Sequence, residues 1–161
     1  GASDYGDNIY FGYPQHKHTT ASEICVAGAV ALPRVDIMYI NAGFSADLID
    51  AALQRGAQGL VIAGVGNGNM SVATLAALGN AVAKGAVVVR SSRVGSGRVG
   101  RNVEVDDDTL GTIAAGDLSP AQSRVLLKLV LHTLNLAAPA VASADHDKSR
   151  ATLVQDYFDS Y

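Results

Sequence analysis

The sequence has one cysteine and no tryptophan among its 161 residues, and only 6% of the residues are aromatic. The single cysteine, Cys25, cannot form a disulfide within the chain, so cysteine usage does not indicate a redox compartment. Cys25 lies in the apolar run EICVAGAVAL with no activating base beside it. We therefore expect Cys25 to fill a small apolar space rather than to act as a catalytic thiol.

The sequence also lacks a long apolar run and a strong excess of either charge. Its most apolar window, VLLKLVLHTL, is interrupted by Lys128 and His132 and is too short to cross a bilayer. The chain starts at Gly1 without a charged stretch leading into an apolar one, so no signal peptide is expected in it. A net charge of −3 argues against nucleic acid or an anionic membrane as the main partner. We expect a soluble protein, or a piece of one.

Glycine and apolar residues are plentiful, with 17 glycines and 48% hydrophobic residues. From residue 35 onward, apolar runs alternate with helical patterns. The runs cover 35–40, 59–64 and 86–91, a weaker one covers 113–115, and the helical patterns cover 45–56, 71–84 and 119–134. This alternation predicts an α/β fold, Rossmann-like, in which helices flank a small open parallel sheet of about four strands.

Polar residues at the helix ends predict where the helices begin. Ser45 is the expected N-cap of the first helix, which would bury Leu48 among others, and Ser119 with Gln122 forms a capping box for 119–134. The Ala-rich stretch 135–150 is expected to be a loose spacer. The ending ATLVQDYFDSY predicts a short terminal helix that docks on the body.

Residues 1–34 differ from the rest of the chain. NIYFGY is aromatic and β-prone, and we expect one strand there, half of a hairpin whose other half is missing. A polar connector follows it. We therefore predict that 1–34 form the end of a preceding domain and a linker, and that 35–161 form the α/β domain.

The stretch AGVGNGNMS, after the second apolar run, is the first candidate for a site. Gly64 and Gly66 match a dinucleotide-binding fingerprint, but Asn69 stands at the third glycine position. The next strand ends at Arg90 instead of an acidic residue, which further disfavours NAD. Arg90 and Arg93 leave an anion site open as an alternative. The simplest interpretation is a tight turn whose glycines allow positive φ, with Asn69 or Ser71 capping the next helix.

A second candidate follows from the sheet topology. Ligands of open parallel sheets bind beyond the carboxyl ends of the strands. If the second and third strands are neighbours, Asn69 and the segment near Glu104 can face one crevice. The run EVDDD at 104–108 suits a hard cation, although an acidic turn in solvent explains it better. Glu104 is placed to serve the ammonium group of a substrate.

Other chemistry-bearing residues carry weaker signals. His16 and His18 form an H-x-H pair without a further ligand at suitable spacing, so two solvated histidines are the better interpretation and no metal is predicted. Ser91 and Ser92 lack a nucleophile elbow or an adjacent base. No cofactor is expected.

Several stretches together resemble the C-terminal half of bacterial type II L-asparaginases. They are HKHT, LPRVDIMY, GLVIAGVGNGNMS, AVVVRSSRVGSG, VEVDDDTLGTIAAGDLSPAQSRVLLKLVL and QDYFDSY, in the family's order and spacing. The resemblance implies an amidohydrolase that converts asparagine and water to aspartate and ammonia. It also implies a preceding N-terminal domain that carries a threonine nucleophile in a Thr-Gly-Gly-Thr turn and a second threonine backed by an aspartate and a lysine. This chain contains none of those motifs, so we expect the chain alone to be inactive.

The resemblance further implies a role for two residues. In the family, active sites form between the N-terminal domain of one subunit and the C-terminal domain of its neighbour. Asn69 and Glu104 are then substrate-binding residues contributed to a neighbouring subunit, and no catalytic residue lies in this chain. The implied partners are the N-terminal domain, L-asparagine or L-aspartate, and further copies in a tetramer. The implied compartment is the periplasm or outside the cell.

Two other functions remain open from the sequence. The first is a stand-alone α/β module that binds an amino acid or another small anion in the same crevice. The second is a domain that serves only for oligomerisation.

Overall fold

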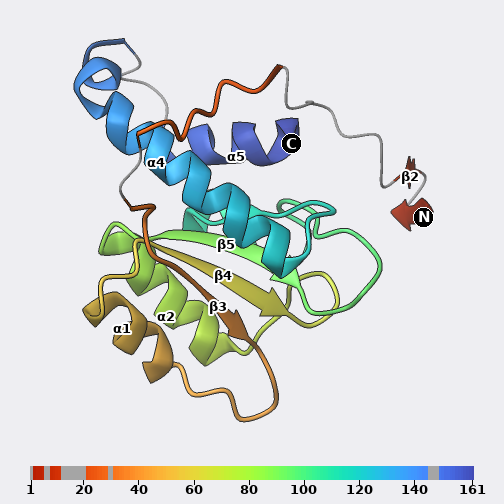
Figure 1. Ribbon diagram of the computed structural model, residues 1–161. Helices are drawn as coiled ribbons and strands as arrows, with labels where there is room; N and C mark the ends of the chain where they lie inside the picture. The colour runs from red at the N-terminus through yellow and green to blue at the C-terminus, as the bar shows by residue number, and fades with distance from the viewer. Residues whose placement is uncertain (1, 6–7, 12–20, 29–30, 145–148) are drawn as a thin grey trace.

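The structure is a computed structural model that describes residues 2–5, 8–11, 21–28, 31–144 and 149–161, and His16 and His18 lie outside these ranges. Its centre is a parallel sheet whose strands follow one another in chain order (Figure 1). The strands are β3 (Val35–Tyr39), β4 (Gly59–Gly64), β5 (Val87–Ser92) and β6 (Ile113–Ala114). The predicted small parallel sheet, including its weak fourth strand, is confirmed.

Helices cover both faces of this sheet. One face carries α1 (Asp47–Gln54) and α2 (Val72–Ala83), and the other carries α4 (Pro120–Ala144) and α5 (Arg150–Ser160) (Figure 1). A short helix, α3 (Asp107–Leu110), leads into β6. The predicted helices flanking a parallel sheet are therefore present.

The alternation of side chains along the strands explains the two layers. Leu60 and Ile62 of β4 join the core beneath α1 and α2, whereas Val61 between them joins the core beneath α4 and α5. All three side chains are fully buried. Successive residues of a strand point to opposite faces, so a run that is apolar throughout predicts a sheet covered on both sides.

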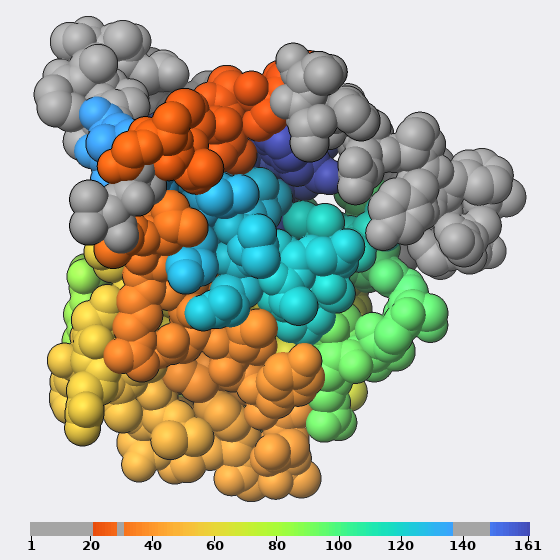
Figure 2. Space-filling view, viewed as in Figure 1, coloured from red at the N-terminus to blue at the C-terminus, as the bar shows by residue number. Residues whose placement is uncertain are grey.

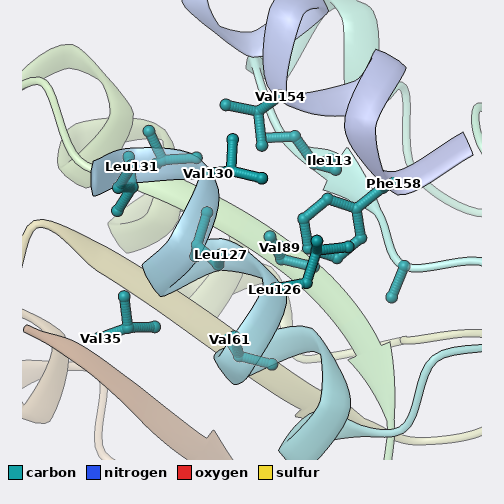
Figure 3. Packing of buried hydrophobic residues seen from close by; sticks show 12 residues of the cluster. Val35, Val61, Val89, Ile113, Leu126, Leu127, Val130, Leu131, Val154 and Phe158 are labelled. Carbon is teal, nitrogen blue, oxygen red and sulfur yellow. The ribbon is translucent and has the colours of Figure 1, made fainter. Parts of the chain in front are cut away.

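The core beneath α4 and α5 joins distant parts of the chain. Leu127 and Leu131 of α4 pack toward the strands, and Phe158 of α5 belongs to the same cluster and lies near Leu126 (Figure 3). Val154 of α5 and Ile113 of β6 complete the same cluster. The predicted docking of the terminal helix is confirmed by this packing.

The capping box at the start of α4 forms as predicted. The backbone N–H of Ser119 donates to Oε1 of Gln122 over 3.0 Å, and the N–H of Gln122 approaches Oγ of Ser119 at 3.4 Å. The loose spacer expected from residue 135 is wrong for its first part, because α4 continues to Ala144. Alanine has the highest helix propensity, so an Ala-rich stretch extends a helix that is already nucleated.

The N-terminus of α2 has a side-chain cap, whereas that of α1 has none. Ser71 caps α2 by accepting a hydrogen bond from the N–H of Thr74 over 3.2 Å, which decides between Asn69 and Ser71. The predicted cap at Ser45 is wrong, because its hydroxyl donates to Asp47 and α1 begins at Asp47 without a side-chain cap. Leu48, expected in the apolar face of α1, is 50% exposed.

The N-terminal strand has a partner, contrary to the prediction. β1 (Ala2–Tyr5) pairs antiparallel with β2 (Asn8–Phe11), so the hairpin that was expected to lack one half is present. The sequence of β1, ASDY, contains Ser and Asp, which are typical of turns. Pairing with a neighbouring strand overrides this weak local preference.

The segment before β3 lies along α4 and α5 (Figure 2). Ser22 and Ile24 are partly buried, and the hydroxyl groups of Ser22 and Tyr161 lie 2.6 Å apart. Cys25 is exposed, so its predicted apolar packing is wrong. Neighbouring residues of an extended segment point in opposite directions, and here Ile24 is the one that packs on the core.

Side chains from α4 and α5 also bind backbone groups at the two edges of the sheet. The side-chain amide of Gln155 accepts from the N–H of Ala114 over 2.9 Å and donates to its carbonyl over 3.2 Å. At the other edge, Nε of Arg124 donates to the carbonyl of Val35 over 2.8 Å. Within the described ranges, no helix is both long and apolar enough to cross a membrane.

Candidate functional site

The carboxyl ends of β4 and β5 carry the two loops that hold the predicted site residues. β4 and β5 are direct neighbours in the sheet, which was the condition for Asn69 and Glu104 to face one crevice. The strand order does not reverse anywhere in the described sheet. A dinucleotide crevice forms at such a reversal, so the topology gives no support to the NAD alternative.

The loop after β4 is a tight hairpin. Val65 and Asn69 exchange two backbone hydrogen bonds of 2.9 and 2.8 Å, and Gly66 and Gly68 between them have φ of 54° and 74°. A Cβ on Gly64 would lie 2.4 Å from the carbonyl carbon of Gly68. The glycines are therefore explained by positive φ and close backbone approach, and a bound phosphate is not needed to explain them.

This hairpin is joined to the loop that follows β5. Oδ1 of Asn67 accepts a hydrogen bond from the N–H of Gly100 over 2.8 Å. The carbonyl of Asn67 accepts from Nη1 of Arg90 over 3.1 Å, and Ser92 Oγ donates to the carbonyl of Gly66 over 2.6 Å. The two loops thus have a fixed relative position.

Arg90 lies at the centre of these contacts, with its side chain 0% exposed. Its Nε and Nη2 donate to the two oxygens of Asp107 over 2.6 and 2.7 Å, and Nη2 also donates to the carbonyl of Gly100 over 3.1 Å. The anion site that was left open at Arg90 is therefore wrong, because this guanidinium is buried and paired with an acidic side chain.

The acidic run 104–108 is not simply an acidic turn in solvent. Asp107 is fully buried against Arg90. Asp106 caps α3, and hydrogen bonds from the N–H and hydroxyl of Thr109 lower the pKa of its carboxyl group. Asp108 accepts hydrogen bonds from Arg101 and then Asn102, which lower the pKa of Asp108. Among the described residues, no group of three or more His, Cys, Asp or Glu side chains suits a metal ion.

The sequence carries a signal for this buried pair. Arg90 interrupts the apolar strand VVVRS, and a charged side chain inside a strand covered on both faces requires an opposite charge nearby. Asp107 supplies that charge. The other candidate hydroxyls are also structural, since Ser91 is buried and donates to the carbonyl of Leu118 over 2.9 Å.

Asn69 and Glu104 themselves are placed on these joined loops. Asn69 is partly buried at the end of the hairpin and makes backbone hydrogen bonds with Val65. Glu104 is exposed between Asn102 and Asp107. Within the described part of the chain, neither side chain makes a hydrogen bond or an ion pair, and none joins the two to each other. Both polar groups are therefore available to a ligand.

Comparison with known protein families identifies the family of this chain. Residues 34–138 match the glutaminase/asparaginase C-terminal domain. The chain belongs to this family. The match includes the loops that carry Asn69 and Glu104 and the whole parallel sheet.

Curated relatives include a protein named probable L-asparaginase periplasmic from Haemophilus influenzae, 44% identical over 118 residues and 73% of this chain. Proteins named L-asparaginase 2 from Escherichia coli and Bacillus subtilis are 42% and 40% identical over 73% and 80% of this chain. The chain spans 34% of the length of each of these relatives. It therefore corresponds to a type II asparaginase C-terminal domain rather than to a complete relative.

Proposed function

We propose that this chain is the substrate-orienting part of an enzyme that hydrolyses L-asparagine to L-aspartate and ammonia. It supplies Asn69 and Glu104 to an active site that is completed by the N-terminal domain of a neighbouring subunit. Residues 1–34 are the end of such a domain and the linker. The Haemophilus influenzae relative is named as periplasmic, and on that basis we propose a periplasmic or secreted location for the assembled protein.

The observation that carries this proposal is the placement of Glu104. Its carboxylate is exposed and has no ion pair among the described residues, although Asp107 and Asp108, which follow it closely, are both paired with arginines. An unengaged carboxylate held on an ordered loop is suited to bind the α-ammonium group of an amino acid through a charge-assisted hydrogen bond. Asn69, on the adjoining loop, is suited to orient the same end of the substrate.

The roles of both residues are in orientation and not in bond-making. The threonine nucleophile implied by the resemblance belongs to the N-terminal domain, and without a nucleophile no acyl-enzyme forms. Holding the substrate in the reactive geometry contributes to the rate by proximity. We therefore expect no asparagine hydrolysis by the chain alone.

The test joins the chain to the N-terminal part of Escherichia coli L-asparaginase 2. We expect asparagine hydrolysis by this fusion, and a loss of at least about 2 kcal/mol, or roughly 30-fold in kcat/KM, for Glu104→Ala. Ammonia release measures both. Asp117→Ala, which removes a partly exposed carboxylate that lies 3.7 Å from Arg98, is the control. An unchanged kcat/KM for Glu104→Ala contradicts the role of Glu104.

Calorimetry separates this function from that of a stand-alone binding module. Aspartate binding by the isolated chain would favour a complete pocket within it. Binding only after an N-terminal part is joined supports the shared site. Turnover by the chain without any N-terminal partner would contradict the proposal.

A further inference from the structure

We propose that Asn67 is a positioning residue that, together with the buried Arg90–Asp107 pair, fixes the Asn69 loop against the segment that bears Glu104. This inference rests on the proposed function of Asn69 and Glu104. It assigns a role to three residues that do not themselves touch the substrate.

Asn67 connects the two loops from the side of Asn69. It is the middle residue of the hairpin closed by Val65 and Asn69, so a shift of Asn67 moves Asn69 with it. Its side-chain oxygen accepts from the N–H of Gly100, and its carbonyl accepts from Arg90. Asn67 therefore contacts both the second loop and the buried guanidinium.

In the loop that follows β5, Gly100 is the residue that Asn67 and Arg90 both contact. Its N–H is held by Asn67 and its carbonyl by Nη2 of Arg90, at 2.8 and 3.1 Å respectively. Both polar groups of one residue are thus bound to groups that also hold the hairpin. The second loop has little freedom to slide relative to the first at this point.

Glu104 lies within a second closed segment. The N–H of Asn102 donates to Oδ2 of Asp107 over 3.0 Å, and the N–H of Asp107 donates to Oδ1 of Asn102 over 2.9 Å. Asn102 has φ of 56°, the one positive value for a non-glycine residue among those described. These reciprocal bonds fix both ends of the segment 102–107, and Glu104 lies between them.

Asp107 joins this segment to the rest of the network. Its carboxylate accepts from Arg90, from the N–H of Asn102 and from the hydroxyl of Thr112 at 2.5 Å. Every buried side-chain nitrogen and oxygen in the described part of the chain has a partner. A fully satisfied buried network specifies one arrangement, which is what two substrate contacts on different loops require.

The variant Asn67→Ala tests this role in the fusion with the Escherichia coli N-terminal part. We expect KM for asparagine to rise about 10-fold while kcat changes less than about 3-fold, because misplaced orienting groups weaken productive binding. Asn67→Asp keeps the acceptor for the N–H of Gly100. We expect it to restore KM to within about 3-fold of the parent value.

Asn135→Ala is the matched control. Asn135 also makes side-chain hydrogen bonds, to Gln58 and Arg150, but it lies near the start of β4 at the opposite end of the strand. We expect the fusion carrying Asn135→Ala to keep its KM. An equal rise of KM in both variants would show a general loss of structure and would overturn the assignment of Asn67.

Glu104→Ala in the same fusion separates this inference from the proposed function. If Glu104→Ala lowers kcat/KM and Asn67→Ala does not raise KM, the positioning role is wrong and the shared site stands. If neither variant changes the kinetics, the proposed function is wrong as well.

Hydrogen exchange on the chain itself tests the connection without any activity. We expect the N–H of Gly100 to exchange at least about 10-fold faster in Asn67→Ala than in the parent and in Asn67→Asp, because its acceptor is lost. The N–H of Val89, in the central sheet, reports whether the fold is kept. Equal exchange at Gly100 in all three proteins would overturn the inference even if the fusion does not assemble.

Discussion

At the scale of single residues, the buried Arg90–Asp107 pair is the most consequential feature of the site. Both side chains are 0% exposed, and the hydrogen bonds between them run from two guanidinium nitrogens to two carboxylate oxygens. A buried ion pair adds little net stability compared with apolar residues, but removal of one partner leaves an uncompensated buried charge. The pair therefore makes both positions intolerant of substitution.

We expect Asp107→Ala to lower the free energy of unfolding by about 3–5 kcal/mol, because Arg90 is left buried and unpaired. Urea unfolding followed by circular dichroism measures this change. The control is Asp50→Ala, which removes an ion pair with Lys84 whose side chains are 53% and 60% exposed. We expect a change below about 1 kcal/mol there. Equal effects of the two substitutions would contradict the importance of burial.

The residues of the candidate site were predictable to different degrees. Asn69 and Glu104 follow the carboxyl ends of two strands, so their segments could be placed together from topology alone. The link between Asn67 and Gly100 joins residues 33 positions apart and depends on the exact shape of both loops. No periodicity or motif encodes such a contact, whereas Arg90 inside an apolar strand was a usable signal.

At the scale of secondary-structure elements, the helix caps show that a serine near a helix start does not always cap the helix. Ser119 and Ser71 act as caps, but the hydroxyl of Ser45 donates to the carboxylate of Asp47 instead. The N-cap position of α1 is held by Ala46, so Ser45 lies one residue too early in the chain to cap the first turn. The residue type alone therefore predicted three caps where two form.

The difference between these serines has a measurable consequence. We expect Ser119→Ala to lower the free energy of unfolding by about 1 kcal/mol, because the first turn of α4 loses its capping box. Ser45→Ala is the matched control, and we expect a change within about 0.5 kcal/mol. Thermal unfolding of both variants gives the comparison. A larger loss for Ser45→Ala would mean that this serine does cap α1.

Most of the elements followed from periodicity. Apart from the four-residue helix α3, the strands and helices from residue 35 to 134 were predicted because apolar runs and helical spacing repeat there. The extension of α4 to Ala144 and the strand β1 were missed. In both cases, neighbouring structure outweighed the local sequence preference. The helix α4 continues into an Ala-rich stretch because the helix is already formed, and the turn-prone residues of β1 form a strand because they pair with β2.

At the scale of the whole molecule, carboxylates on the surface near the site make stability sensitive to acid. Hydrogen bonds from Arg101 and Asn102 lower the pKa of Asp108, and those from Thr109 lower the pKa of Asp106. A carboxyl group with a lowered folded pKa stabilises the fold above its unfolded pKa of about 3.9. That contribution is lost as the pH falls from there through the folded pKa.

We therefore expect the free energy of unfolding to fall when the pH is lowered from about 5 to about 3. The variant Asp108→Asn is expected to be less stable than the parent at pH 7, with the difference shrinking as the pH approaches 3. Urea unfolding at several pH values measures this convergence. Parallel curves for parent and variant over this range would contradict the predicted contribution of Asp108.

The side chains that cover the sheet edges limit how copies of this protein can associate. An edge strand with free N–H and carbonyl groups is a template for another strand, and this is how many sheets grow into aggregates. At β6, the amide of Gln155 occupies both backbone groups of Ala114, and at β3 Arg124 occupies the carbonyl of Val35. Another strand cannot pair with Ala114 or with the carbonyl of Val35 unless these side chains are displaced, which opposes growth of the sheet from one molecule into the next at these positions.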